Sequence, residues 1–342
     1  MYDKLPAFNL LDPQLLRLLP ASPATRPNAP VTQLVDAILV ANPTLVRQKD
    51  ITAKSDNTLF TTLANRLWLS DKPSALVLQS NATKGISSWL FSACQDNHHL
   101  MVPEAEYRES LRLRLLVPVF TPVENIARRC TTCRVENVGS FHALTCKTFG
   151  ECRKRRHDLI TTALAKFVKT CFPAARAQLP YPIPGPRAGQ PLVADAWFVA
   201  GDWSRYVDVV VTSPAVSHAQ DVQRLPAAGK AGREAAARKK DKYRGKYADA
   251  TFNQVVPFAI EASGRLCQEA AAFVDMVVDQ AADRQVASQA RLHLFARIGK
   301  LLATGNGKLV LLSRTSVVPV PIQPPAPPIV AAPLPAVVVP PA

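Results

Sequence analysis

The stretch Leu192–Val211, LVADAWFVAGDWSRYVDVVV, decides the fold of the central part of this chain. Apolar and aromatic runs flank Gly201-Asp202, and a Gly-Asp pair between two such runs predicts a β-hairpin with a two-residue turn. Counting outward from that turn places Asp195 opposite Asp208. Directly opposed residues of an antiparallel pair have Cβ atoms about 5 Å apart. Two carboxylates that close repel unless a positive group lies between them, and a divalent cation is the obvious candidate.

The composition bounds the size of the molecule and the class of its partners. A chain of 342 residues, 48% of them apolar, is long enough for one large domain or two modest ones with a substantial core. Lysine and arginine number 41 against 26 acidic residues, which gives a formal net charge of +15. This excess favours a polyanionic partner, nucleic acid before a membrane surface, although a merely soluble basic protein fits the composition equally well.

Cysteine usage and hydropathy indicate the compartment. The chain has seven cysteines, and four of them crowd into residues 130–152 beside histidines. An odd, clustered count predicts metal ligation in a reducing compartment rather than a disulfide framework. The first twenty residues carry acidic residues and prolines within their apolar stretch, unlike a signal peptide. No uninterrupted apolar run reaches the about 18 residues that a membrane helix needs, so we expect an intracellular protein.

The cysteine and histidine cluster has the spacing of a zinc knuckle. Cys130 and Cys133 are separated by two residues, His142 follows after eight more, and Cys146 after three more. This pattern predicts one tetrahedral zinc ion held by three thiolates and an imidazole. Four protein ligands leave no open position for water, so the zinc would be structural. Its binding would supply the folding energy of a segment too polar to form its own core.

Two alternatives to this ligand set stay open from the sequence alone. Cys152 and His157 are spare ligands, either of which could replace Cys146. The pair Cys130 and Cys133 and the pair His142 and Cys146 could also be structurally inert residues that happen to lie near each other.

A basic run follows the cluster directly. It consists of Arg153, Lys154, Arg155 and Arg156. Such a run usually marks a solvated face, but beside a knuckle we expect it to contact the phosphates of nucleic acid.

The remaining patterns divide the chain into segments. We expect a mostly helical region over 1–125, the knuckle with its basic run over 126–156, an α/β domain over 157–312, and a disordered proline-rich tail over 313–342. Within the α/β domain the expected elements are a helix over 157–172, the hairpin over about 192–213, a basic Ala-rich helix over about 230–248, the strand QVVPFAIEAS, and one or two long helices from Arg265. The sequence GNGK at 305–308 predicts a turn rather than a phosphate loop.

The order of these features resembles the C-terminal region of non-LTR retrotransposon polyproteins that carry a restriction-like endonuclease. In that family a Cys-Cys-His-Cys knuckle leads to an Arg-His-Asn segment, then to a Pro-Asp or Ala-Asp pair, a second Asp, and a helix with Lys before a basic residue and Tyr. The resemblance spans roughly residues 85–310. The matching residues are Cys130, Cys133, His142, Cys146, Arg156, His157, Asp158, Ala194, Asp195, Asp208, Lys239, Lys242 and Tyr243.

The resemblance implies a PD-(D/E)XK fold, a central mixed sheet flanked by helices, and the nicking of target DNA. It implies that Asp195 and Asp208 hold Mg²⁺, which lowers the pKa of bound water and clamps the scissile phosphate. Lys239 would orient that water or stabilise developing negative charge. Lys240 and Lys242 are rival catalytic lysines and otherwise phosphate contacts. DNA is the expected partner, with the RNA of the element as a second, and the nucleus is the expected location.

The chain departs from the family pattern at several points. Asp158 replaces the usual Asn, Gln178 stands where family members often have an acidic residue, and Ala194 replaces the Pro of the Pro-Asp pair. No reverse-transcriptase core is recognisable, since YADA at 247–250 lacks the paired aspartates of a polymerase site. We therefore expect the endonuclease end of an element, as a truncated copy or a detached reading frame.

Simpler interpretations of the same residues remain. Asp195 could cap a strand, and Asp208 could pair with a buried arginine. A zinc-dependent nucleic-acid-binding module without catalysis would explain the knuckle, the charge and the missing acid near Gln178. A third interpretation is a proline-tailed interaction protein whose α/β body is a decayed scaffold.

Overall fold

The computed structural model describes residues 48–81, 101–117, 119, 126–135, 139, 141–187, 189–216 and 227–321. The chain divides into two compact units, Met1–Leu63 and Ala64–Ala342. Helix α3 (Gln48–Ser70) begins in the first unit and ends in the second. The elements below all belong to the second unit.

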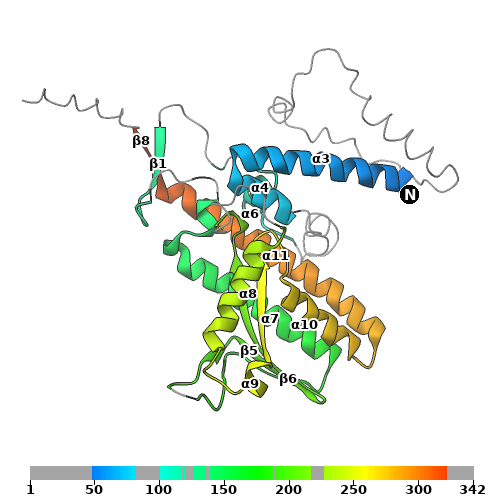
Figure 1. Cartoon of the computed structure of the whole chain (residues 1–342). Coiled ribbons are helices and arrows are strands. Elements are labelled where there is room, and N and C mark those ends of the chain that lie inside the picture. Colours follow the sequence, from blue (N-terminus) through cyan, green and yellow to red (C-terminus); the bar gives the residue numbers. More distant parts are fainter. Residues whose placement is uncertain are drawn as a thin grey trace, which may run out of the picture. The chain divides into compact units, whose positions relative to one another are not determined.

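A four-stranded mixed sheet forms the centre of this unit (Figure 1). Its strands, in spatial order, are β2 (Arg176–Gln178), β5 (Ala196–Ala200), β6 (Trp203–Thr212) and β7 (Val255–Glu261). Strand β5 pairs antiparallel with both β2 and β6, and β6 pairs with β7 in parallel. The expected mixed α/β fold is therefore confirmed.

The predicted hairpin has the predicted register. Ala196 pairs with Val207 and Ala200 with Trp203, so the turn falls on Gly201 and Asp202. Gly201 has a φ of +54°, a left-handed conformation that glycine adopts without a steric penalty. The ladder ends at the Ala196–Val207 pair, and Asp195 and Asp208 are the next residues beyond it in the two chain segments.

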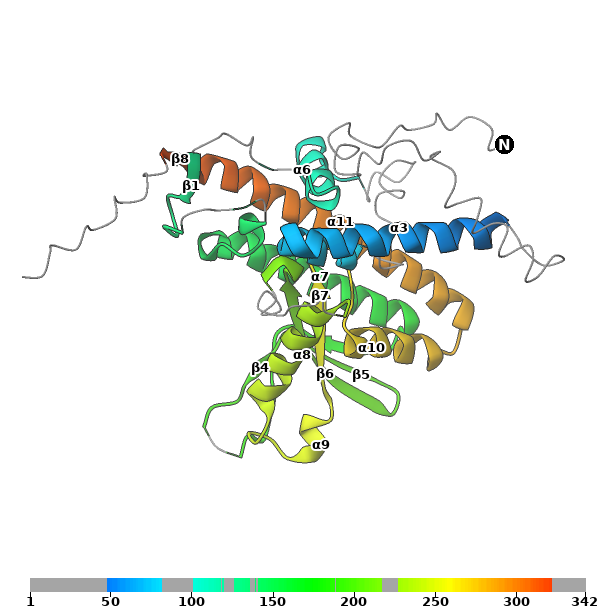
Figure 2. The same ribbon diagram turned by 45° about the horizontal axis from the view of Figure 1, so that its top comes forward.

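Helices cover both faces of the sheet. The main core lies between one face of the sheet and three helices: α7 (Gly150–Cys171), α10 (Gln268–Asp279) and α11 (Arg284–Ser316). That core is made of alternate strand residues such as Phe198, Val207 and Phe258 and of helix residues such as Ile160, Leu164, Phe273, Val277 and Ile298. Helix α8 (Lys230–Tyr243) lies against β6 and β7 in both views (Figure 1, Figure 2).

Helix α11 corrects the turn expected at GNGK, because Gly305 and Gly307 lie inside a continuous helix. Their role is close packing. A Cβ atom on Gly307 would lie 2.1 Å from the backbone oxygen of Glu106 in helix α6 (Glu104–Arg114). A Cβ on Gly305 would lie 2.5 Å from Cδ of Arg156 in α7. Glycine lets these backbones approach, and the surrounding apolar residues keep the helix intact.

The start of the expected disordered tail was also wrong. Helix α11 continues to Ser316, and β8 (Val317–Pro321) pairs antiparallel with β1 (Ile126–Cys130). Proline lacks a backbone N–H and has a fixed φ, which keeps it out of helix interiors and central strands. A two-stranded ribbon has only edge strands, which tolerate Pro319 and Pro321 because half of their N–H groups need no partner in the ladder. Residues 322–342 lie outside the described residues.

Within 1–125 the described elements are helices, as expected: α3, α4 (Lys72–Asn81) and α6. Residues 1–47 and 82–100 lie outside the described residues. None of the described helices has the length and hydropathy needed to cross a bilayer. The short elements that complete the unit are η3 (His142–Leu144), η4 (Lys147–Phe149), β3 (Tyr181–Pro182), β4 (Val193–Ala194), η5 (Pro214–Val216) and α9 (Asp249–Phe252).

Candidate functional site

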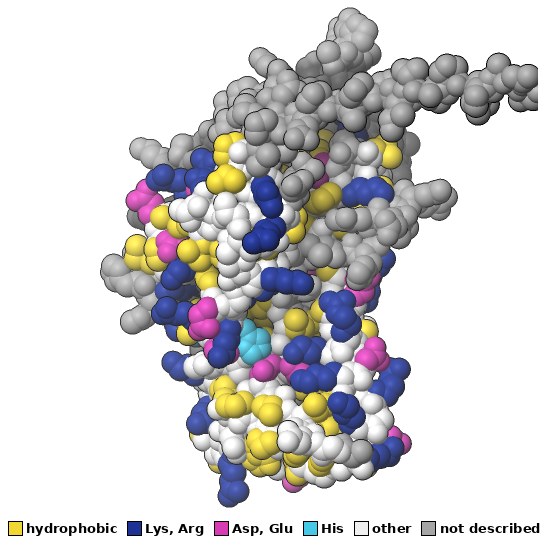
Figure 3. Space-filling view, turned by 90° about the vertical axis from the view of Figure 1, so that its left-hand side faces the viewer, with side chains coloured by type: hydrophobic (Ala, Val, Ile, Leu, Met, Phe, Trp, Pro, Cys, Tyr) yellow, Lys and Arg dark blue, Asp and Glu magenta, His cyan; other side chains and the backbone are white. Residues whose placement is uncertain are grey.

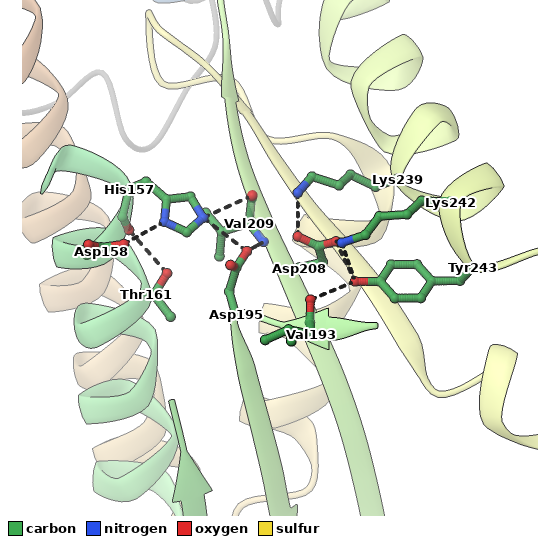
Figure 4. A network of polar contacts seen from close by, with 10 residues as sticks. All are labelled: His157, Asp158, Thr161, Val193, Asp195, Asp208, Val209, Lys239, Lys242 and Tyr243. Carbon is green, nitrogen blue, oxygen red and sulfur yellow. Dashed lines mark hydrogen bonds and ion pairs between the residues drawn. The ribbon is translucent and has the colours of Figure 1, made fainter. Parts of the chain in front are cut away.

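Asp208 lies in the middle of β6 and is the most buried carboxylate of the site, with 1% of its surface exposed. Three side chains of α8 converge on it (Figure 4). Lys239 Nζ donates to Oδ1, Lys242 Nζ lies 3.3 Å from Oδ2, and the Tyr243 hydroxyl donates to Oδ2 over 2.6 Å. Residues 239, 242 and 243 share one face of a helix at this spacing, and that face packs across β6.

Asp195 lies just before β5 and is held from the other side. Its Oδ2 accepts the backbone N–H of Val209 over 2.7 Å and lies 3.0 Å from Nε2 of His157 in α7. Both bonds use Oδ2. Figure 4 shows the result: His157 reaches Asp195 from α7, the α8 side chains reach Asp208, and the two carboxylates lie between the helices.

The charges of the site shift the pKa values of its groups in opposite directions. Burial alone would lower the pKa of His157, but its hydrogen bonds to Asp195 and Asp158 outweigh burial and raise it to about 9. Burial opposes the charge on Asp195, yet the hydrogen bond from His157 and the charge of that imidazole lower the pKa of the carboxyl below its usual value. Burial and the charge of Asp208 raise the pKa of Tyr243, which therefore acts as a hydrogen-bond donor. The site therefore holds two carboxylates together with three cationic side chains, those of His157, Lys239 and Lys242.

The start of α8 is fixed by a buried glutamate. Glu261, at the end of β7, accepts the backbone N–H of Gly232 over 3.1 Å and a hydrogen bond from Ser80 in α4. A carboxylate at a helix N-terminus satisfies an otherwise unpaired donor and complements the helix dipole. This contact anchors the helix that carries Lys239 and Lys242.

The four predicted zinc ligands come together. Their ligand atoms all lie within 4.8 Å of one another. Cys130 Sγ lies 3.9 Å from Cys146 Sγ, and Cys133 Sγ lies 3.5 Å from His142 Nε2. On a tetrahedral zinc, two sulfurs are about 3.8 Å apart, and a sulfur and a nitrogen about 3.6 Å. The donor set and its spacing therefore fit a zinc ion, whereas a disulfide needs about 2.05 Å between sulfurs.

The electrostatics of the cluster suit a metal. Burial alone would raise the pKa of Cys130, but hydrogen bonds from the Cys133 backbone and from His142 lower it to about 6, toward the thiolate that zinc binds. Burial raises the pKa of Cys133, so a cation would be needed to ionise both thiols. The segment is also less isolated than its polarity suggested. Cys130 and Cys146 belong to a buried cluster with Leu309 and Val310 of α11.

The spare zinc candidates lie elsewhere. Cys152 is half-buried in the first turn of α7, outside the four-residue ligand group. His157 belongs to the carboxylate site, so the ligand set with Cys146 is the one that the structure assembles.

The basic run is split by the helix that contains it, because α7 begins at Gly150 rather than 157. Arg156 was expected to contact nucleic acid, and this is wrong: it is buried and donates to Asn306 of α11, and burial lowers its pKa to about 10. Arg153 donates to backbone oxygens of Thr145 and Lys147. Lys154 and Arg155 are exposed, so they remain available to phosphates.

The two other lysines proposed as phosphate contacts have partners. Lys240 lies 3.4 Å from Glu269 of α10, away from Asp208, and is therefore excluded as a rival for that carboxylate. Lys242 lies in the site itself. In the space-filling view, a histidine and several acidic side chains gather on one face, with lysine and arginine side chains around them (Figure 3).

Sequence reasoning did not assign the contacts of Tyr243, His157 and the Val209 backbone. The hairpin register could have located the Val209 N–H beside Asp195. The other two depend on how α7 and α8 pack on the sheet, for which the sequence contains no local signal. No protein-family model matches this chain, and no curated protein is similar to it at a significant level.

Proposed function

We propose that this protein is a metal-dependent endonuclease that hydrolyses phosphodiester bonds of DNA, with a PD-(D/E)XK-type core. The observation that carries the proposal is the meeting of Asp195, Asp208 and Lys239 at one place, from three separate elements. Two carboxylates and an ammonium group are what metal-assisted phosphodiester hydrolysis requires.

The donor set fits Mg²⁺. Magnesium is bound in such sites by one or two carboxylates, with water and substrate phosphate oxygens as its other ligands. Asp208 and Oδ1 of Asp195 would be those carboxylate ligands, since the hydrogen bonds from His157 and Val209 to Asp195 use Oδ2. Bound there, the ion would acidify a water molecule and offset charge on the phosphate.

The protein side chains have distinct roles in the proposed reaction. Lys239, which bonds Asp208, would turn its ammonium toward the phosphate oxygens as negative charge develops on them. Tyr243 holds Asp208, and His157 holds Asp195, each through a hydrogen bond to one carboxylate oxygen. These bonds fix the carboxylates before substrate arrives, which reduces the reorganisation needed during reaction.

We further propose that the protein derives from a non-LTR retrotransposon and acts on that element's DNA target in the nucleus. The order of features along the chain supports this: a Cys/His cluster, then α7 with His157, the two aspartates, and α8 with its lysines. The net charge of +15 supports a nucleic-acid partner.

The test is nicking of supercoiled plasmid by the purified chain in Mg²⁺. We expect nicking by the wild type, and a loss of at least about 100-fold in Asp208→Asn, because the variant keeps the shape of the side chain but not its charge. Lys240→Gln is the matched control, since Lys240 contacts Glu269 and not the site. Equal nicking by Asp208→Asn and wild type would exclude the proposed site.

A second candidate function is zinc-dependent binding of nucleic acid without cleavage. Two observations favour it. Gln178, where the family often has an acid, pairs with Trp197 in β2. In addition, Lys239, Lys242 and Tyr243 already satisfy Asp208 without a metal. This function predicts DNA affinity that falls steeply with salt, no Mg²⁺-dependent nicking, and no effect of Asp208→Asn on affinity.

A further inference from the structure

An open, largely apolar pocket of about 500 Å³ lies at the turn end of β5. Its walls come from the C-terminal end of α7, from β2, from the β5–β6 hairpin and from the connection between α10 and α11. They include Phe172, Arg176, Trp197, Val199, Gly201 and Gln280. None of its lining residues is acidic, and Arg176 is exposed. The pocket therefore offers aromatic walls beside a single cation.

Trp197 is held rigidly at this pocket. Its indole Nε1–H donates to Ser204 Oγ over 2.9 Å. Its ring stacks on Tyr181, with centroids 4.6 Å apart and an interplanar angle of 18°. Tyr181 in turn stacks on Tyr206. The indole is only half-buried, and a ring fixed in this way loses little conformational freedom when a ligand binds.

One wall of the pocket, Trp197, lies near the carboxylate site along the sheet. Trp197 follows Asp195 by two residues, and its cross-strand partner Tyr206 precedes Asp208 by two. Residues two apart along a strand lie on the same face at a separation of about 6.8 Å. A nucleotide next to a phosphate at the carboxylates can span that separation.

We propose that this pocket takes an unpaired nucleobase of the DNA strand whose phosphate lies at Asp195 and Asp208, with Arg176 beside the adjoining phosphate. The proposal rests on the proposed nuclease function and specifies its substrate. A base inside a duplex has both faces covered by its neighbours, so only an unpaired base can stack on an aromatic side chain. The substrate is then DNA with a single-stranded segment next to the cleaved bond.

The test measures the affinity of the full chain for two DNAs by fluorescence anisotropy, in Ca²⁺ without Mg²⁺. Both are the same duplex with a single-stranded tail; in one the tail carries bases, and in the other it is abasic. The phosphates are identical, so charge contributes equally. We expect the tail with bases to bind about tenfold more tightly. A 2-aminopurine in the tail should lose fluorescence on binding, which reports stacking without interference from the four tryptophans of the chain.

Variants locate the effect. Trp197→Leu should abolish the preference for bases, whereas Trp197→Phe keeps an aromatic face and should keep most of it. Phe295→Leu is a matched control, because Phe295 is a partly buried aromatic residue of α11 that does not line the pocket. If Trp197→Leu fails to fold, as judged by circular dichroism, Trp197→Phe and the 2-aminopurine signal of the wild type decide the question.

Equal affinity for the two tails, or an unchanged preference in Trp197→Leu, would overturn the proposal. A preference lost in Arg176→Gln but kept in Trp197→Leu would also exclude a stacking pocket. Plasmid nicking in Mg²⁺ is a separate readout that depends on Asp208. A pocket that fails is therefore distinguishable from a nuclease function that fails.

Discussion

The Cys/His cluster and the carboxylate site are constructed in opposite ways. The cluster takes all its ligands from the single segment Cys130–Cys146. The carboxylate site takes residues from α7, from the start of β5, from β6 and from α8, up to 86 residues apart between His157 and Tyr243. Local spacing is enough to recognise the first, whereas the second exists only after the sheet and both helices have packed.

The two centres nevertheless share two helices. Helix α7 begins four residues after Cys146 and reaches the carboxylate site at His157. Its Arg156 bonds Asn306 of α11, and α11 also packs under the Cys/His cluster. A substitution at one centre is therefore expected to affect the other through α7 and α11.

Loss of the metal ligands is expected to have the largest effect. Cys130→Ser should abolish the binding of one zinc ion per chain and lower the free energy of unfolding by about 5 kcal/mol. This is less than the about 10–16 kcal/mol of isolated zinc-finger peptides, because the segment also packs on α11. Zinc content by atomic emission and thermal unfolding check this. Cys152→Ser is the control and should retain zinc; if it loses the metal as well, the assigned ligand set is wrong.

The second-largest effect is expected from a methyl group placed where α6 and α11 touch. Gly307→Ala places a methyl group 2.1 Å from the backbone oxygen of Glu106, which cannot move alone, and should cost about 3 kcal/mol. Gly305→Ala meets the flexible side chain of Arg156 and should cost less. Urea unfolding of both variants measures the difference. A tolerated Gly307→Ala would show that α6 is free to shift.

Removal of one hydroxyl from the carboxylate site should have a smaller effect. Tyr243→Phe removes the 2.6 Å bond to buried Asp208 and should cost about 1–2 kcal/mol in urea unfolding. Nicking should fall while zinc content stays unchanged, because Tyr243 belongs to only one centre. A parallel loss of zinc would mean that the two centres are coupled more tightly than their contacts indicate.

The smallest effect is expected at Lys240. Its pair with Glu269 is more than one-third exposed, and solvent screening leaves such pairs a contribution of less than about 0.5 kcal/mol. Lys240→Gln should leave stability unchanged and lower DNA affinity less than Lys154→Gln does, since Lys154 is exposed near the Cys/His cluster. Fluorescence anisotropy at two salt concentrations compares them, and the opposite order would restore Lys240 as a DNA contact.

The sequence predicted features that depend on near neighbours. The hairpin register followed from the Gly201-Asp202 turn, and the ligand set followed from the spacing of Cys130, Cys133, His142 and Cys146. It failed where distant packing overrides local preference. Glycines that usually mark a turn lie within α11 because α6 and α7 approach closely there, and Arg156 is buried because Asn306 accepts its hydrogen bond.

By itself, then, the sequence determined the hairpin and the metal-binding segment, because strand alternation and ligand spacing act over a few residues. Only the tertiary structure decided which lysines reach Asp208, that His157 holds Asp195, and that Trp197 borders a pocket. The direction of a side chain on α7 or α8 is fixed by the rotation of the whole helix against the sheet. That rotation results from the summed packing of the core, which no short stretch of sequence specifies.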